Sequence, residues 1–124
     1  MTTPTAAVVR QARELLADET HWTQGAYARG AFDKAGDWGH WVAPCDEGAV
    51  RWCMVGAIAK CAGVIDLAGV ESIAVDLTDT AIRAGLLSAP NSVLDVNDHN
   101  IHREVLGYMA NLADALEREE VVNA

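Results

Sequence analysis

Residues 46–63, DEGAVRWCMVGAIAKCAG, constrain the fold of this chain more than any other stretch of its sequence. Their apolar residues recur at helical spacing along two adjoining stripes, so a helix formed here is buried on most sides. Asp46 and Glu47 suit the positive end of a helix dipole, and Gly63 supplies a left-handed stop. The pattern predicts a central helix over residues 47–62.

Gly56 lies inside this predicted helix, where glycine destabilises by about 1 kcal/mol relative to alanine. A helical glycine often allows another part of the backbone to come close, because it has no Cβ atom. We therefore predict that Cys53, Gly56 and Ala57 form a shallow groove, and that another helix crosses this groove.

Apolar repeats predict three further helices, over residues 3–18, 70–84 and 100–119. Thr3 and Pro4 resemble a cap followed by the first helical residue. Asn97 and Asp98 precede the last apolar repeat, and they are predicted to cap that helix with their side-chain oxygens. Residues 92–96 are predicted to be a short extended piece.

Residues 21–45 break the helical pattern and hold three of the four Trp residues. A disordered segment rarely carries so many large rings, so we predict a long ordered loop with one helical turn over residues 27–32. The predicted fold class is all-α: a compact bundle of about four helices around the central small-residue helix. At 124 residues, the chain is expected to form a single domain, 1–124.

The formal net charge is −9, and the basic residues are scattered singly along the chain. Direct binding to nucleic acid is therefore not expected. The three cysteines are an odd count, and neither a basic and apolar N-terminal signal nor a run of eighteen apolar residues occurs. We expect a reduced cytoplasmic protein that does not enter a membrane, and the sequence leaves its oligomeric state open.

Three stretches resemble the signature of an uncharacterised family of small proteins found mainly in actinobacteria and their phages: HWTQGAYAR, AVRWCMVGAI, and VND followed by a helix containing EVL. The resemblance covers roughly residues 15–116 and implies no established activity. Family members often have Trp where this chain has Val96. The resemblance implies that nine residues belong to one structural or functional unit: Trp22, Gln24, Gly25, Trp52, Cys53, Gly56, Ala57, Asn97 and Asp98.

Cys53 is the main candidate for catalysis. In a hydrolase or transferase, Cys53 would attack the substrate, His99 or His102 would act as base, Asp98 would orient that base, and Gln24 would stabilise an oxyanion. Against this, Cys53 is predicted to lie about two turns inside the central helix, where the dipole is weak and buried cysteine is usually a small hydrophobe. The structural interpretation is preferred.

A metal site would have to draw on the cysteines and histidines of the chain, namely Cys45, Cys53, Cys61, His40, His99 and His102. No pair of cysteines has the spacing of a zinc site, and Cys53 and Cys61 are about 12 Å apart on a helix. We predict no metal and no cofactor.

The Trp-rich loop is the predicted site for a partner or ligand, formed by Trp22, Gln24, Trp38, His40 and Trp41. The acidic surface is densest at Glu117, Glu119 and Glu120, and it offers a second surface to a basic partner. No strong catalytic or nucleotide-binding motif is present. We therefore expect a non-enzymatic interaction or regulatory protein that binds a protein partner, with the cysteine-dependent enzyme as the alternative.

Overall fold

The computed structural model describes residues 3–31 and 39–123, and this part of the chain is mostly helical. The helices are α1 (Ala6–Leu16), α2 (Met54–Ala62), α3 (Leu67–Arg83), α4 (Val93–His99) and α5 (His102–Val122), with a short 3₁₀ helix, η1 (Glu19–His21). Two short strands, β1 (Ala28–Arg29) and β2 (Arg51–Trp52), pair antiparallel. The mostly helical fold is confirmed, with five described helices where about four were expected.

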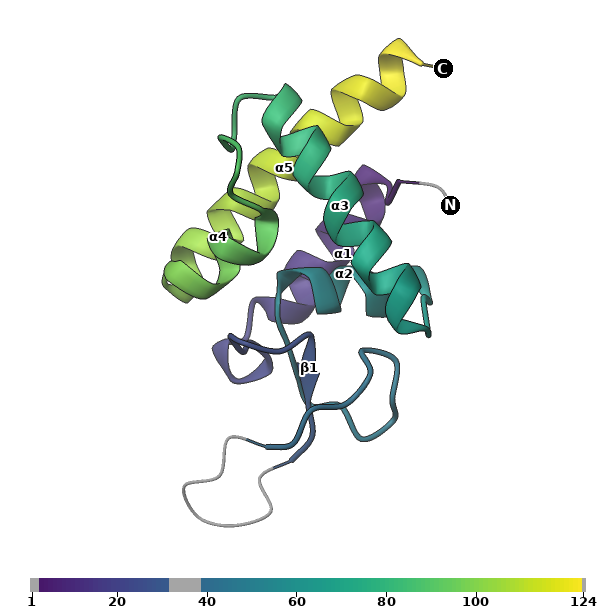
Figure 1. The fold of residues 1–124 in the computed structure, drawn as a ribbon, viewed down its shortest axis with the longest axis vertical. Helices are drawn as coiled ribbons and strands as arrows, with labels where there is room; N and C mark the ends of the chain where they lie inside the picture. Colours follow the sequence, from purple (N-terminus) through teal and green to yellow (C-terminus); the bar gives the residue numbers. More distant parts are fainter. Residues whose placement is uncertain (1–2, 32–38, 124) are drawn as a thin grey trace.

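The helices pack together at one end of the molecule, while most of the described chain between α1 and α2 lies at the other end (Figure 1). α1 packs against both α2 and α5. The start of α1 lies beside the last turns of α5, because the backbone N–H of Ala6 donates a hydrogen bond to the Glu120 carboxylate at 2.7 Å. Both of these helix ends lie well away from β1 (Figure 1).

α2 is the most deeply buried element of the described chain. Its first six residues, from Met54 to Ala59, are all buried. It belongs to one hydrophobic core with large side chains from other helices that are also fully buried, namely Leu16, Ile73, Leu77, Met109 and Leu112. The expectation of a buried central helix built from small residues is thus confirmed for the C-terminal half of the predicted range.

The start of α2 was predicted wrongly. The helix begins at Met54, about two turns after the predicted start at residue 47. Asp46 instead forms a turn, in which its carboxylate accepts a hydrogen bond from Gly48 N at 2.7 Å. Such a local bond offers the backbone an alternative to the helix. Arg51 and Trp52 then pair with β1, which keeps this stretch extended.

Gly56 is in close contact with another backbone segment, as predicted, but that segment is not a helix. A Cβ atom at this position would lie 1.8 Å from the carbonyl oxygen of Tyr27. The same carbonyl accepts a hydrogen bond from Cys53 N at 3.1 Å. The extended chain leading into β1 therefore crosses the start of α2, and only glycine fits at the crossing.

The predicted extended piece at residues 92–96 is also wrong, because these residues begin α4. Ser92 precedes the helix, and its backbone N–H donates to the Asp95 carboxylate at 2.8 Å. The next N–H, of Val93, donates to Thr78 Oγ1 in α3 at 3.1 Å. This start signal, a serine with an acidic residue three positions later, is visible in the sequence.

The other helix ends differ from prediction by a few residues. Thr5 caps α1, with Val8 N donating to its hydroxyl, so Thr3 and Pro4 precede the helix. Asp66 caps α3, which starts three residues earlier than expected. Residues 27–32 do not begin as a helical turn, because β1 occupies part of that range.

Candidate functional site

Asn97 is the centre of a buried hydrogen-bond network that joins three parts of the chain. Its side chain lies in α4 and is fully buried. Its Oδ1 accepts hydrogen bonds from Trp22 Nε1 at 2.8 Å and from Met54 N at 3.0 Å. Its Nδ2 donates to the Thr23 carbonyl at 3.1 Å and to Asp98 Oδ1 at 3.0 Å. All four hydrogen-bonding directions of this amide are therefore used.

Asn97 and Asp98 therefore do not cap the last helix, as the sequence suggested. Both lie in the last turn of α4, and the Asn97 side chain instead accepts the first backbone N–H of α2, that of Met54, across 43 positions of sequence. α5 begins after Ile101, whose N–H donates to Glu104 at 3.2 Å. The prediction failed because a cap can come from a distant part of the chain as well as from the preceding residues.

Gln24 and Asp98 complete this network. Gln24 Nε2 donates to the carbonyls of Asn97 and Asn100 at 3.0 and 3.1 Å, and so it satisfies carbonyl groups at the end of α4. Asp98 accepts a hydrogen bond from Gly25 N at 3.0 Å. The amide predicted to stabilise an oxyanion thus holds the end of a helix.

Arg29 was not singled out from the sequence, yet it organises the segment before β1. Its guanidinium donates to Thr23 Oγ1 and to the Gln24 carbonyl, each at 3.0 Å, and to the Gly39 carbonyl at 3.3 Å. One side chain therefore connects the strand to both flanking loops. The sequence gave no signal of this role, because the hydrogen-bond partners of a single arginine depend on the tertiary fold.

Cys53 is the N-cap of α2, and so the prediction that it lies two turns inside a helix is wrong. It is only 3% exposed, and its sulfur accepts a hydrogen bond from Gly56 N at 3.3 Å. A helix N-terminus ordinarily lowers a thiol pKa, but burial here raises the pKa of Cys53 to about 12. Cys53 is therefore a neutral thiol near pH 7, which is a poor nucleophile.

Neither candidate base, His99 or His102, lines the pocket beside Cys53, and His102 shares a structural role with His21, which was not a candidate. His102 Nε2 donates to the Leu16 carbonyl at 2.5 Å, and His21 Nδ1 donates to the Leu15 carbonyl at 2.9 Å. Both rings therefore satisfy carbonyls at the end of α1, since a carbonyl can only accept. His99 is exposed at the last position of α4.

A pocket of about 190 Å³ opens beside this network. Cys53 and Asp98 line it together with three larger side chains, Tyr27, Trp41 and Leu94. This recess is mainly apolar, and its lining includes neither of the histidines proposed as the base. Two of the predicted residues, Cys53 and Asp98, do meet there.

The predicted binding residues of the Trp-rich loop lie in different environments. Trp22 and Gln24 are half-buried members of the Asn97 network. Trp41 is 72% exposed, and its ring borders the pocket. His40 is exposed, and its ring lies against Gly30. Trp38 lies outside the described residues.

Comparison with known proteins gives one match. The model of a family of unknown function, DUF6197, matches residues 1–115. This chain belongs to that family. No curated protein and no solved structure matches the chain. The range matched by DUF6197 contains the Asn97 network, Cys53 and Trp41, and it ends before the last residues of α5.

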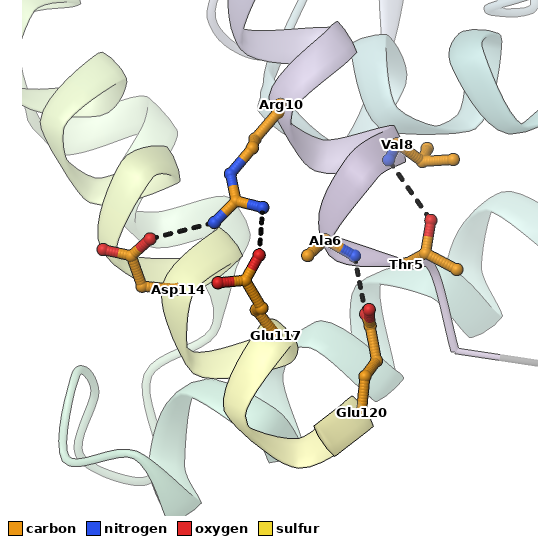
Figure 2. Close-up of polar contacts among 7 residues, drawn as sticks. All are labelled: Thr5, Ala6, Val8, Arg10, Asp114, Glu117 and Glu120. Carbon is orange, nitrogen blue, oxygen red and sulfur yellow. Dashed lines mark hydrogen bonds and ion pairs between the residues drawn. The ribbon is translucent and has the colours of Figure 1, made fainter. Parts of the chain in front are cut away.

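The acidic C-terminal end of this DUF6197 member is paired within the chain. Arg10 on α1 bonds Asp114 at 3.0 Å and Glu117 at 2.8 Å, while Glu120 accepts from Ala6 N (Figure 2). Glu119 forms an ion pair with Arg83 of α3 at 3.0 Å. The three glutamates proposed as an acidic docking surface therefore hold α5 against its neighbours.

Within residues 3–31 and 39–123, no group of three or more His, Cys, Asp or Glu side chains is placed to hold a metal ion. Two of the cysteines, for example, lie at different ends of α2. The Cys45 thiol donates to the Val64 carbonyl at 3.3 Å, just after the helix, whereas Cys53 precedes its first residue. None of the helices in the described ranges combines the length and apolar character of a membrane span.

Proposed function

We propose that this chain is a non-enzymatic interaction or regulatory protein of the cytoplasm, of the accessory type that phages and actinobacteria carry, and that it binds a protein partner. The observation that supports this proposal is the apolar surface around Trp41. Trp41 is 72% exposed, and two aliphatic side chains that line an adjoining pocket, Ile65 and Leu67, are 76% and 61% exposed. Clustered apolar exposure of this kind is typical of interaction sites.

The network beside this surface supports a binding role as well. Asn97, Trp22 and Gln24 fix the segment that carries Tyr27, and Tyr27 lines the same pockets as Trp41. A surface held rigid before binding loses less conformational entropy when a partner docks. The buried polar groups therefore serve the surface by positioning it.

Affinity capture from host lysate with a matched pair of variants tests this proposal. Trp41→Ser should abolish enrichment of the partner, because an exposed aromatic ring is the usual anchor of an interface. Ile101→Ser is the control, since Ile101 is 53% exposed on a different part of the chain and should retain capture. Equal enrichment by all three baits, or none by the wild type, would count against the proposal.

The cysteine-dependent hydrolase or transferase is the alternative, and one observation favours it: Cys53 lies at a helix N-terminus and shares a pocket with Asp98. Its raised pKa opposes this role. We expect iodoacetamide near neutral pH to alkylate Cys45 and Cys61, which are half-buried, before Cys53. Mass spectrometry of the partly alkylated native protein measures the order. Fastest labelling at Cys53 would favour the enzyme.

A further inference from the structure

The exposed face of α3 carries apolar and acidic side chains in alternation. Leu67, Glu71, Val75 and Asp79 are spaced four residues apart, so they form one stripe along the helix. All four are exposed, with Leu67 at 61% and Val75 at 59%. The stripe runs from Leu67 to Asp79, a rise of about 18 Å along the helix.

Two hollows border this stripe. One, of about 290 Å³, is lined by Leu67 with Trp41 and Ile65. The other, of about 320 Å³, is lined by Glu71, Val75 and Asp79. Tyr27 lines both of them and also the pocket beside Cys53, so the three hollows adjoin one another around this residue. Together they form a groove, which we call the Tyr27 groove.

The Tyr27 groove is acidic as well as apolar. Its described lining includes four carboxylates, Asp66, Glu71, Asp79 and Asp98, and no Lys, Arg or His. The ion pairs found among described residues lie between α5 and the helices α1 and α3, and none of them involves these four carboxylates. Arginines of the chain therefore balance the acidic end of α5, whereas no described Lys or Arg forms an ion pair with a carboxylate of the groove.

We propose that the Tyr27 groove binds an amphipathic helix of a partner protein, whose docking face carries aliphatic side chains and Lys or Arg. This inference rests on the proposed function and names the chemistry of its partner. Ridges formed by residues four apart on one helix pack into the grooves of another, so a helix is the natural occupant of this stripe. Basic residues at the turns facing Glu71 and Asp79 complete the match.

A second copy of this chain is a poorer occupant. Its net charge is −9, and docking the same surface on itself would bring Glu71 and Asp79 toward like charges. Like-charge contacts across an interface oppose association. Charge complementarity therefore selects a basic partner over self-association.

Panning a random dodecapeptide library displayed on phage against the full chain tests the proposal. We expect selected peptides to combine aliphatic residues at helical spacing with Lys or Arg. Glu71→Lys should weaken a selected peptide at least tenfold by fluorescence anisotropy, and Val75→Ser should weaken it severalfold. Glu14→Lys, which makes the same charge change at an exposed residue outside the groove, should have little effect.

The same experiment can overturn the inference. No enrichment, selection of acidic or uncharged peptides, or equal weakening by Glu71→Lys and Glu14→Lys would each refute it. Concentration-dependent dimers in sedimentation velocity that Val75→Ser abolishes would assign the groove to a second copy. If lysate capture depends on Trp41 but not on Glu71, the proposed function stands while the basic helix is refuted. If a selected peptide binds with the expected dependence on Glu71 but lysate capture enriches no protein, the chemistry of the groove stands while the proposed function is refuted.

Discussion

Two polar networks hold the described helices of this chain together, and they differ in burial. The network around Asn97 is centred on a side chain that is inaccessible to solvent, and it joins α4, the start of α2 and the segment at residues 22–24. The network around Arg10 is exposed and joins α1 to α5 (Figure 2). Both use side chains far apart in sequence, so sequence separation does not distinguish them.

Burial decides how much each network contributes to stability. A buried donor or acceptor that loses its partner cannot turn to water, so deleting one side chain costs the desolvation of every group it served. An exposed ion pair exchanges its partner for water and salt at little cost. The Asn97 network should therefore specify the fold, and the Arg10 network should only support it.

The largest effect on stability is expected where the chain leading into β1 crosses the start of α2, because no side chain fits there. Gly56→Ala places a methyl group 1.8 Å from the Tyr27 carbonyl, and this contact is with backbone, which cannot rotate away. We expect a loss of more than about 4 kcal/mol in the free energy of unfolding, or failure to fold. Urea denaturation followed by circular dichroism measures it.

Gly107→Ala is the matched control for this substitution. Gly107 also lies inside a helix, α5, but a Cβ atom there would meet nothing within 4 Å. The change should therefore stabilise the protein by up to about 1 kcal/mol, since alanine is the better helix former. Equal losses in the two variants would show that the crossing of α2 by Tyr27 is not as close as described.

Asn97→Ala should have the next largest effect. It leaves Trp22 Nε1, Met54 N and the Thr23 carbonyl without their partner. We expect a loss of about 3 kcal/mol, since each unsatisfied buried group costs about 1–3 kcal/mol and entering water recovers part of it. The urea midpoint should fall accordingly. Asn111→Ala, at an exposed position of α5, should leave that midpoint nearly unchanged.

The parts of the fold that follow a local pattern could be predicted from the sequence. The apolar repeats located α1, α3 and α5 to within a few residues, and small residues correctly indicated that α2 is buried. The start of α2 could not be predicted, because pairing of Arg51 and Trp52 with β1 overrides a helical pattern there. α4 was missed although Ser92 and Asp95 signal its start.

The candidate site shows a similar division. The resemblance grouped Trp22, Gln24, Asn97 and Asp98, and the structure does bring these side chains into one network. Their roles could not be predicted, because hydrogen-bond partners across more than 70 positions depend on the tertiary fold. The exposure of Trp41 likewise has no local signal, since the same residue type is buried at Trp52.

Cys53, at the start of α2, offers a smaller test of burial through the pH dependence of the free energy of unfolding. An unfolded thiol loses its proton near pH 9, whereas the buried thiol keeps it up to about pH 12. The folded state therefore binds more protons in this window, so stability is full below pH 9 and falls as pH rises. We expect this group to contribute a slope of about 1.4 kcal/mol per pH unit above pH 9.

Cys53→Ser isolates that contribution. A serine hydroxyl can accept the Gly56 N–H as an N-cap but does not titrate in this range, while Tyr27 and Tyr108, whose pKa values burial also raises, remain in both proteins. Urea titrations at pH 8, 9 and 10 should show a shallower decline for the variant. Parallel declines would mean that Cys53 reaches solvent in the folded protein.

The smallest effect is expected at the exposed network. Arg10→Gln removes the ion pairs to Asp114 and Glu117 but leaves every group in contact with water, and the Ala6 N–H keeps its bond to Glu120. The urea midpoint should shift only slightly at 0.15 M salt, and the shift should be larger at 0.01 M, where screening is weaker. Asn97→Ala should lose the same stability at both salt concentrations, because no mobile ion reaches a buried amide. If Arg10→Gln instead lost a large amount of stability at both salt concentrations, the exposed network would contribute as the buried one does. Burial would then not decide how much a network contributes to stability.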